Sequence, residues 1–274
     1  MNKKPIGVFD SGYGGLTVLK EICKQLPEYD FVYLGDNARA PYGPLPFETV
    51  YEYTLEAVKW FFNEHGCPLV ILACNTASAK ALRTIQQNDL PDINPLKRVL
   101  GVIRPTSEVI EEYTDSNHIG ILATVGTVQS ASYLLEIQKF HPEITVSQQA
   151  STEWVELVEN GKHNSSQADG PVKMHIDNLL SKDKEIDCIL LACTHYPLLL
   201  NKIKQFVPQN INVISQGEIV ANSLKKYLEK HNEIDIKCSK NAITKFFTTG
   251  NEEDFNSHAT LFFGDDVAAT KIKL

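Results

Sequence analysis

Two stretches of this 274-residue chain place a cysteine among side chains that can exchange protons. Residues 71–79 read I-L-A-C-N-T-A-S-A and residues 189–200 read I-L-L-A-C-T-H-Y-P-L-L-L, so Cys74 and Cys193 each end an apolar run. A thiol followed by amide, hydroxyl or imidazole groups can act as an acid, a base or a nucleophile. A lone cysteine is more often a small buried hydrophobic residue, and we interpret the other four in that way: Cys23, Cys67, Cys188 and Cys238.

We expect Cys74 and Cys193 each to lie at the carboxyl end of a strand and at the start of a helix. Ligands of open α/β sheets bind beyond the carboxyl ends of the strands, and the unpaired amides of a helix start favour a thiolate. A free thiol with a pKa of about 8.5 is only ~3% ionised at pH 7, and lowering that pKa by ~1.5 units requires ~2 kcal/mol. Because His195 follows Cys193 so closely, we expect it to donate a hydrogen bond or share a proton there.

A third stretch, D-S-G-Y-G-G-L-T-V at residues 10–18, follows an apolar run and precedes a helical pattern. Its glycines would let backbone amides approach an anionic group. The stretch lacks the Lys-Ser/Thr of a phosphate loop, which argues against a nucleotide site. A tight turn would explain the glycines but not Asp10 and Ser11. Residues 35–43, G-D-N-A-R-A-P-Y-G, again place turn residues after a strand, although an ordinary loop explains them equally well.

These stretches must be positioned by alternating strands and helices. Short β-branched runs predict strands at Ile6–Phe9, Phe31–Leu34, Leu69–Ala73, Val99–Ile103, Ile119–Ala123, Ile144–Ser147, Ile189–Ala192 and Ile211–Ile214. Apolar stripes predict helices around residues 18–26, 50–62 and 199–206, the last with Pro197 in its first turn. Parallel neighbouring strands need helical crossovers, so the pattern predicts an α/β fold with mainly parallel sheets.

Two domain boundaries are expected, one near Asn94-Pro95 and one near Pro208. If the run Ile211–Ile214 returns to the first sheet, the first domain is discontinuous. The predicted division is therefore 1–97 plus 208–274 for one α/β domain and 98–207 for the other. The two A-C phrases then fall one in each domain.

The composition limits the class of protein. The chain has 43% hydrophobic and 22% charged residues and a formal net charge of −8, which is typical of a soluble globular protein and argues against nucleic acid or an anionic membrane as a partner. Neither a signal peptide nor a membrane span is visible. The six cysteines are scattered without a C-x-x-C pair, which indicates reduced thiols and a cytoplasmic location.

Several reactions could use two separated thiols. Cys74, Cys193 and His195 lack the paired spacings of a structural zinc site, and a redox pair usually has a C-x-x-C segment or a resolving partner. A cysteine hydrolase needs one nucleophile only. Racemisation uses both thiols, because one face of a carbon loses a proton while the opposite face gains one. Two related halves facing each other would suit products that are mirror images.

Five stretches, in order, resemble the motifs of the bacterial glutamate racemases: G-V-F-D-S-G-Y-G-G-L-T-V, G-D-N-A-R-A-P-Y-G, A-C-N-T-A-S-A, I-L-A-T-V-G-T-V and A-C-T-H-Y-P-L-L. The resemblance runs from about residue 6 to F-F-T-T-G-N near residue 250. It implies an isomerase that interconverts L- and D-glutamate with no cofactor and no metal, and that supplies D-glutamate for peptidoglycan. It also implies two pseudo-symmetric α/β domains with the active site in the cleft between them, and a homodimer.

Carried over motif by motif, the resemblance implies that Cys74 acts on the D-enantiomer and Cys193 on the L-enantiomer. Asp10 would assist Cys74, and His195 would assist Cys193, by positioning the thiols or relaying protons. The matching motifs would also hold the substrate through Asp10, Ser11, Pro41, Tyr42, Gly43, Asn75, Thr76, Thr194 and His195. Hydroxyls, amides and backbone N–H groups are suited to carboxylates and to charge that grows as a proton leaves.

The resemblance weakens in two places. Residues 151–159, S-T-E-W-V-E-L-V-E, lack the Cys-Pro start and the second proline that the family usually has there. Glu159 aligns with a family carboxylate proposed to assist catalysis, although a surface glutamate on a helix is the more common explanation for such a residue. Residues 215–218, S-Q-G-E, match the family only loosely.

Three other functions would fit parts of this pattern. An aspartate racemase of the same superfamily would use the same two thiols, with a pocket of different reach. A two-lobed protein that only binds an acidic amino acid has no use for paired thiols. A thiol-dependent metal enzyme would lose its activity in the presence of a chelator.

Overall fold

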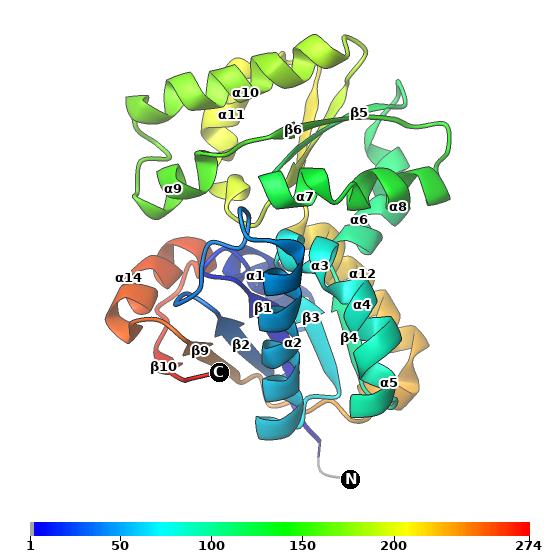
Figure 1. The fold of residues 1–274 in the computed structure, drawn as a ribbon, viewed down its shortest axis with the longest axis vertical. Helices are drawn as coiled ribbons and strands as arrows, with labels where there is room; N and C mark the ends of the chain where they lie inside the picture. The colour runs from blue at the N-terminus through cyan, green and yellow to red at the C-terminus, as the bar shows by residue number, and fades with distance from the viewer. Residues whose placement is uncertain (1–2) are drawn as a thin grey trace.

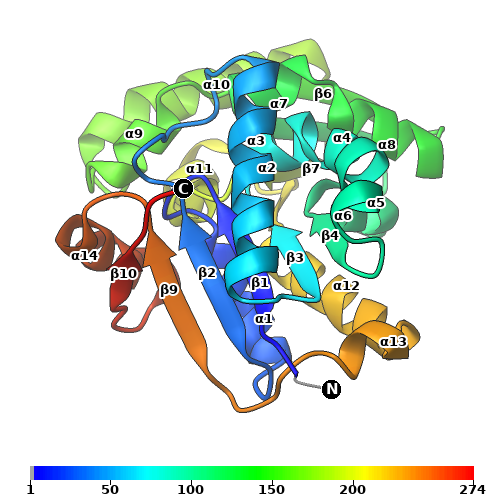
Figure 2. The same ribbon diagram turned by 60° about the horizontal axis from the view of Figure 1, so that its bottom comes forward.

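A six-stranded parallel sheet forms one half of the computed structural model, which describes residues 3–274 (Figure 1). The strand order is β10-β9-β2-β1-β3-β4. Figure 2 shows these strands side by side, with helix α2 across one face of the sheet. The strands are β1 (Ile6–Asp10), β2 (Phe31–Gly35), β3 (Leu69–Leu72), β4 (Arg98–Gly101), β9 (Thr244–Thr248) and β10 (Ala269–Lys271).

A second, four-stranded parallel sheet forms the other half, with strand order β6-β5-β7-β8. Its strands are β5 (His118–Ala123), β6 (Thr145–Ala150), β7 (Cys188–Ala192) and β8 (Asn212–Ser215). The central strands β5 and β7 are almost wholly buried, as strands covered by helices on both faces should be. The predicted α/β class with two parallel sheets is confirmed.

Helices flank both sheets and supply the crossovers. Those around the six-stranded sheet are α1 (Leu16–Gln25), α2 (Phe47–Glu64), α3 (Asn75–Lys80), α4 (Leu82–Thr84), α5 (Leu90–Ile93), α12 (Gly217–Lys230), α13 (Asn232–Asp235) and α14 (Glu252–Phe263). Those around the four-stranded sheet are α6 (Ile103–Val109), α7 (Val125–Gln129), α8 (Ser132–Phe140), α9 (Trp154–Glu159), α10 (Asp169–Lys182) and α11 (Leu200–Phe206). Short 3₁₀ or π segments extend some of them: η1 (Ile85–Asp89), η2 (Ile110–Tyr113), η3 (Ser166–Ala168) and η4 (Tyr196–Leu199).

All eight predicted strands are present, with their ends shifted by a few residues. The largest difference is at the sixth strand, which continues to Ala150 and not only to Ser147. The fourth strand stops at Gly101 because α6 begins at Ile103. Two strands, β9 and β10, were not predicted. The three-residue β10 lies at the edge of its sheet and is largely exposed, so it carries no buried apolar run that could have revealed it.

The predicted sheet membership of two strands is wrong. We expected the strand near residue 99 in the second half, but β4 pairs with β3 in the six-stranded sheet. We also considered that the strand near residue 212 returns to the first sheet, but β8 pairs with β7 in the four-stranded sheet. The sequence of a strand does not identify the neighbouring strand with which it pairs. The chain therefore passes from the first half to the second between β4 and α6, and it returns between β8 and α12. We call these two places the linking segments.

The two halves share buried surface. One contiguous apolar cluster includes Ile71 from the first sheet, Leu122 and Leu191 from the second, and the Cys193 side chain. A separate cluster between the six-stranded sheet and α2 contains Cys74. Among residues 3–274, no helix combines the length and the apolar composition that crossing a membrane would require.

Candidate active site

Cys74 lies at the carboxyl end of β3 and caps the start of α3, as expected. Its Sγ accepts a hydrogen bond from the Ala77 amide at 3.4 Å and lies 3.6 Å from the Ser11 hydroxyl. Burial raises the pKa of the Cys74 thiol to about 12, and the negative charge of Asp10 adds to this effect, while the Ala77 and Ser11 hydrogen bonds oppose it. The amide at the helix start therefore favours the thiolate, as expected, but desolvation outweighs this one amide.

Asp10, the last residue of β1, is completely buried beside Cys74. Its Oδ1 accepts a hydrogen bond from the Gly12 amide at 2.9 Å. Burial raises the pKa of Asp10, whereas the charge of His195 and the amides of Gly12 and Gly15 act to lower it. The Gly12 amide of the glycine turn therefore donates to the carboxyl group of Asp10 itself.

The same turn must approach the second half of the molecule closely. A Cβ atom placed on Gly14 would collide with the Thr194 hydroxyl and would lie 2.5 Å from Nδ1 of His195. Thr17, one turn later, donates a hydrogen bond to the Thr194 carbonyl at 3.0 Å. Glycine at position 14 therefore lets the first strand-to-helix turn pack directly against the Cys193 stretch.

Cys193 follows β7 directly and is buried. The neighbouring His195 is also buried, and its Nε2 lies 2.9 Å from Oε1 of Glu159. Burial alone would lower the pKa of His195, but its hydrogen bonds to Cys193 and Glu159 raise that pKa to about 10. His195 is therefore an imidazolium at neutral pH, and its charge can balance a thiolate at Cys193.

The two cysteine stretches meet across the interface of the sheets. The Thr194 hydroxyl donates a hydrogen bond to Oδ2 of Asp10 at 3.3 Å. A negative charge on Cys193 would raise the pKa of Cys74. A titratable group lies beside each thiol: Asp10 beside Cys74, and the His195–Glu159 pair beside Cys193. Glu159, which sequence alone left undecided, thus contacts His195 directly.

Asn75 and Thr76 also lie at this interface, but their side chains already have partners. Asn75 Nδ2 donates to Oε1 of Gln216 at 2.7 Å, and its Oδ1 accepts from the Tyr133 hydroxyl at 2.6 Å. Thr76 Oγ1 lies 3.0 Å from Oγ1 of Thr124. Both residues therefore join the six-stranded half to the four-stranded half.

The stretch Pro41, Tyr42 and Gly43 reaches the second half through its backbone. The Gly43 carbonyl accepts a hydrogen bond from the Gly126 amide at 3.1 Å. The Tyr42 ring is buried, and its hydroxyl donates to the Asp36 carboxylate. The Tyr42 side chain thus has a structural partner.

Three further polar residues of the interface were missed by sequence reasoning: Thr124, Tyr133 and Gln216. Nε2 of Gln216 lies 2.9 Å from the Thr106 hydroxyl and 3.3 Å from the Val102 carbonyl. Residues this far apart in the chain give no local signal of their pairing. Thr124 lies in the I-L-A-T-V-G-T-V motif and Gln216 in the loosely matching S-Q-G-E segment, but neither stretch indicates a partner.

Metal-ligating side chains do not gather at the two thiols. Within residues 3–274, one group has donor atoms near enough to one another for a cation, namely Glu111, His141 and Glu143. This group contains none of the residues expected at the site.

Two parallel sheets, each with a buried cysteine just beyond the end of one strand, define a two-lobed α/β protein with both thiols near the contact between its lobes. The chain belongs to the Asp/Glu/Hydantoin racemase family, whose model matches residues 8–224. The predicted enzyme class, a racemase among the isomerases, is confirmed by this membership.

The chain is similar to several glutamate racemases over nearly its whole length. The chain is 38% identical to the glutamate racemase of Listeria monocytogenes serotype 4a, over 99% of both proteins. It superposes on the glutamate racemase isoform RacE1 of Bacillus anthracis with a TM-score of 0.90, 34% identity and coverage of 100% and 99%. The glutamate racemase of Francisella tularensis, solved in complex with D-glutamate, gives 0.88, 28% identity and coverage of 100% and 98%.

The aspartate racemase of Picrophilus torridus shares only the fold. It gives a TM-score of 0.52 and 20% identity over 85% of this chain. The alternative of an aspartate racemase is therefore the less supported one.

Proposed function

We propose that this chain interconverts L- and D-glutamate by proton transfer between the α-carbon and two cysteines, without a cofactor, and that it supplies D-glutamate for peptidoglycan. The observation that carries the proposal is the pair of buried thiols, Cys74 and Cys193, each from a different sheet and each with its own charged partner. The glutamate racemases that the chain resembles over nearly its whole length support the choice of substrate.

Reaction from L-glutamate begins with Cys193 as a thiolate beside the His195 imidazolium and Cys74 as a thiol. The Cys193 thiolate takes the α-proton, and the electron pair of the C–H bond stays on the α-carbon and spreads into the α-carboxylate. The Cys74 thiol then gives its proton to the opposite face. The products are D-glutamate, a Cys193 thiol and a Cys74 thiolate, so atoms and charge balance.

Reaction from D-glutamate is the same path in reverse, with Cys74 as the base. Because burial raises the pKa of Cys74 to about 12, a proton must leave this thiol before it can act as a base. Asp10 is the nearest candidate to receive or position that proton, because burial raises its pKa as well. The Ser11 hydroxyl at 3.6 Å would stabilise the Cys74 thiolate.

The remaining motif residues are proposed to hold the substrate carboxylates and the amino group. Ser11, Thr76 and Thr194 offer hydroxyls, and Asn75 offers an amide whose orientation Gln216 and Tyr133 fix. Pro41, Tyr42 and Gly43 would contribute backbone groups, since the Tyr42 hydroxyl is engaged by Asp36. A substrate enclosed between the lobes would meet these dipoles out of water, where each is stronger.

Circular dichroism of L-glutamate in a reducing buffer with chelator tests the proposal. We expect the optical signal of glutamate to decay to zero, and that of L-aspartate to persist. Loss of the aspartate signal alone would move the function to the aspartate racemases.

Cys74→Ser and Cys193→Ser should each abolish or severely reduce the decay while the far-ultraviolet spectrum of the protein is unchanged, because a hydroxyl is a much weaker acid and base partner than a thiol. Full activity in either variant would contradict the assignment.

A cytoplasmic location and a homodimer are further parts of this proposal. The six cysteines are all free, which supports a reducing compartment. Sedimentation of the purified protein would measure the oligomeric state.

A further inference from the structure

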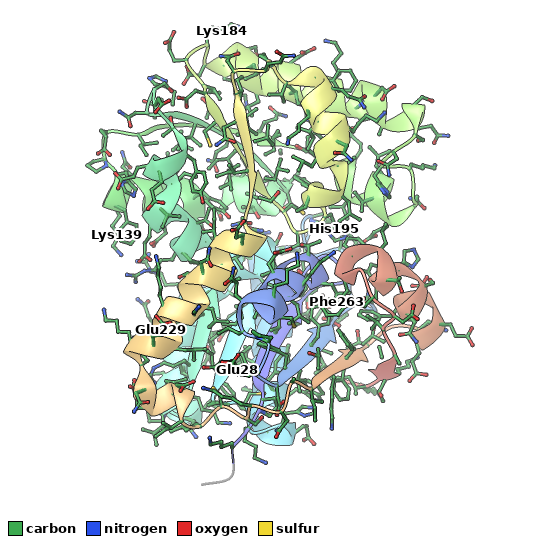
Figure 3. All side chains as sticks on the ribbon, turned by 180° about the vertical axis from the view of Figure 1, so that it is seen from behind. Glu28, Lys139, Lys184, His195, Glu229 and Phe263 are labelled. Atoms are coloured by element: carbon green, nitrogen blue, oxygen red, sulfur yellow. The ribbon has the colours of Figure 1, made fainter. Side chains whose placement is uncertain are left out.

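Helix α14 of the six-stranded half covers the end of α9 in the four-stranded half. Figure 1 shows the two helices on the same side of the molecule, and Figure 3 labels His195 where the lobes meet, next to the helix that ends at Phe263. The Phe262 ring packs edge-on against the His195 ring at 5.2 Å. His258, one turn earlier, places its Nε2 3.1 Å from the Glu159 carbonyl. This contact joins the two halves beside the proposed acid–base pair.

Both ring nitrogens of His258 face carbonyl oxygens. Nε2 faces the Glu159 carbonyl, and Nδ1 lies 2.8 Å from the Asp254 carbonyl. Because a carbonyl oxygen can only accept, Nε2 must carry a hydrogen for the bond to Glu159 to form. Other neighbours hold the ring in place: Oδ1 of Asp254 lies 3.4 Å from Nδ1, the Ser257 hydroxyl lies 3.3 Å from Nδ1, and the Tyr13 ring stacks on the His258 ring at 4.8 Å.

Glu159 contacts both histidines: its backbone carbonyl faces His258, and its side chain contacts His195. Glu159 is the last residue of α9, where carbonyls lack donors within the helix, and its carboxylate lies 2.9 Å from His195. A six-residue helix has little stability of its own, so its last residue depends on contacts from outside. We infer that His258 is a positioning residue: its ring fixes the end of α9 so that the Glu159 carboxylate stays on His195.

This inference rests on the proposed function for its catalytic consequence, but its structural part can be tested separately. Removing the donor should free Glu159, and His195 should then lose its proton below the pH of about 10 expected for the wild type. His258→Phe and His258→Ala remove the donor, whereas His258→Gln keeps an N–H group near the position of Nε2. His118→Phe is a matched control, because His118 is 31% exposed and paired with Asp183, as His258 is 30% exposed and paired with Asp254.

The readout is NMR titration of the His195 ring, followed by steady-state kinetics. We expect the Phe and Ala variants to titrate at lower pH, and their kcat and kcat/KM to fall together by about tenfold, the effect of one lost hydrogen bond to a charged group. The Gln and His118→Phe variants should match the wild type.

An unchanged titration of His195 in the Phe or Ala variant would overturn the inference, as would an equal shift in His118→Phe. If the Phe and Ala variants fail to fold, His258→Gln still decides, since a lowered titration there contradicts the role of the donor. If the wild type does not racemise glutamate but the titrations behave as expected, the proposed function fails and the positioning role stands.

Discussion

At the scale of single residues, the two thiols differ because their partners differ. Cys74 lies beside a buried carboxylate, whereas Cys193 lies beside a buried imidazolium. Burial and the charge of Asp10 therefore favour a proton on Cys74. The two enantiomers have equal free energy in solution, so kcat/KM must be the same in both directions at every pH.

The charge on His195 predicts the alkaline limb of that shared profile. Because the folded-state pKa of His195 is raised to about 10 from 6.5, the imidazolium is present at neutral pH and is lost as the pH rises through about 10. We expect kcat/KM for either enantiomer to fall through the same range. His195→Asn should lower kcat/KM by about 10²-fold at pH 8 and should abolish that limb.

The same shift predicts the pH dependence of stability. A raised pKa stabilises the folded protein, and this contribution is complete below the unfolded pKa of 6.5 and disappears as the pH rises to about 10. The difference in melting temperature between the wild type and His195→Asn should therefore shrink over this range. A constant difference would show that His195 is not charged in the folded protein.

At the scale of elements, the sequence predicted what local patterns encode. Strands such as Leu69–Leu72 and Cys188–Ala192 are continuous apolar runs, and the polar residues directly after them mark the site. Sequence could not assign β4 and β8 to their sheets, because register and partner are decided by hydrogen bonds between distant segments. It also could not foresee that burial would keep Cys74 protonated, because desolvation depends on residues packed from both halves.

The two linking segments between the halves provide a test at this scale. Gln216 lies in the second linking segment, and its amide contacts the Val102 carbonyl in the first. The same amide contacts Tyr133 in the four-stranded half and Asn75 next to Cys74. Gln216 is 4% exposed, so Gln216→Leu would leave buried polar groups without a partner. We expect a loss of about 1–3 kcal/mol in the free energy of unfolding, measured by urea denaturation.

Gln205→Leu is the control for that substitution, because Gln205 lies in the exposed part of α11. Its effect should stay within about 0.5 kcal/mol. Equal unfolding midpoints for the two variants would show that the Gln216 contacts do not hold the two linking segments together.

At the scale of the whole molecule, the site exists only where the two halves meet. Asp10 and Cys74 come from the six-stranded half, whereas Cys193, His195 and Glu159 come from the four-stranded half. A shared apolar cluster and the contacts of Thr194, Gly126 and Thr124 hold the halves in this arrangement. A ligand between them should therefore stabilise the entire chain.

We predict that either enantiomer of glutamate raises the melting temperature of the protein by the same amount at equilibrium. A ligand at 100 times its dissociation constant adds about 2.7 kcal/mol to the free energy of unfolding. Glutamine, which lacks the distal charge, should give a much smaller shift in the same calorimetric measurement. A larger shift with aspartate than with glutamate would argue for the other substrate.

The most direct test of the two-thiol account is the fate of the α-hydrogen in D₂O. At low conversion of unlabelled L-glutamate, we predict that the D-glutamate formed carries deuterium at the α-carbon, because its new hydrogen comes from the Cys74 thiol. The L-glutamate recovered at that time should remain unlabelled, because Cys193 can return only the proton that it removed. Deuterium appearing equally in both enantiomers from the start would mean that one group serves both faces, and would contradict the account.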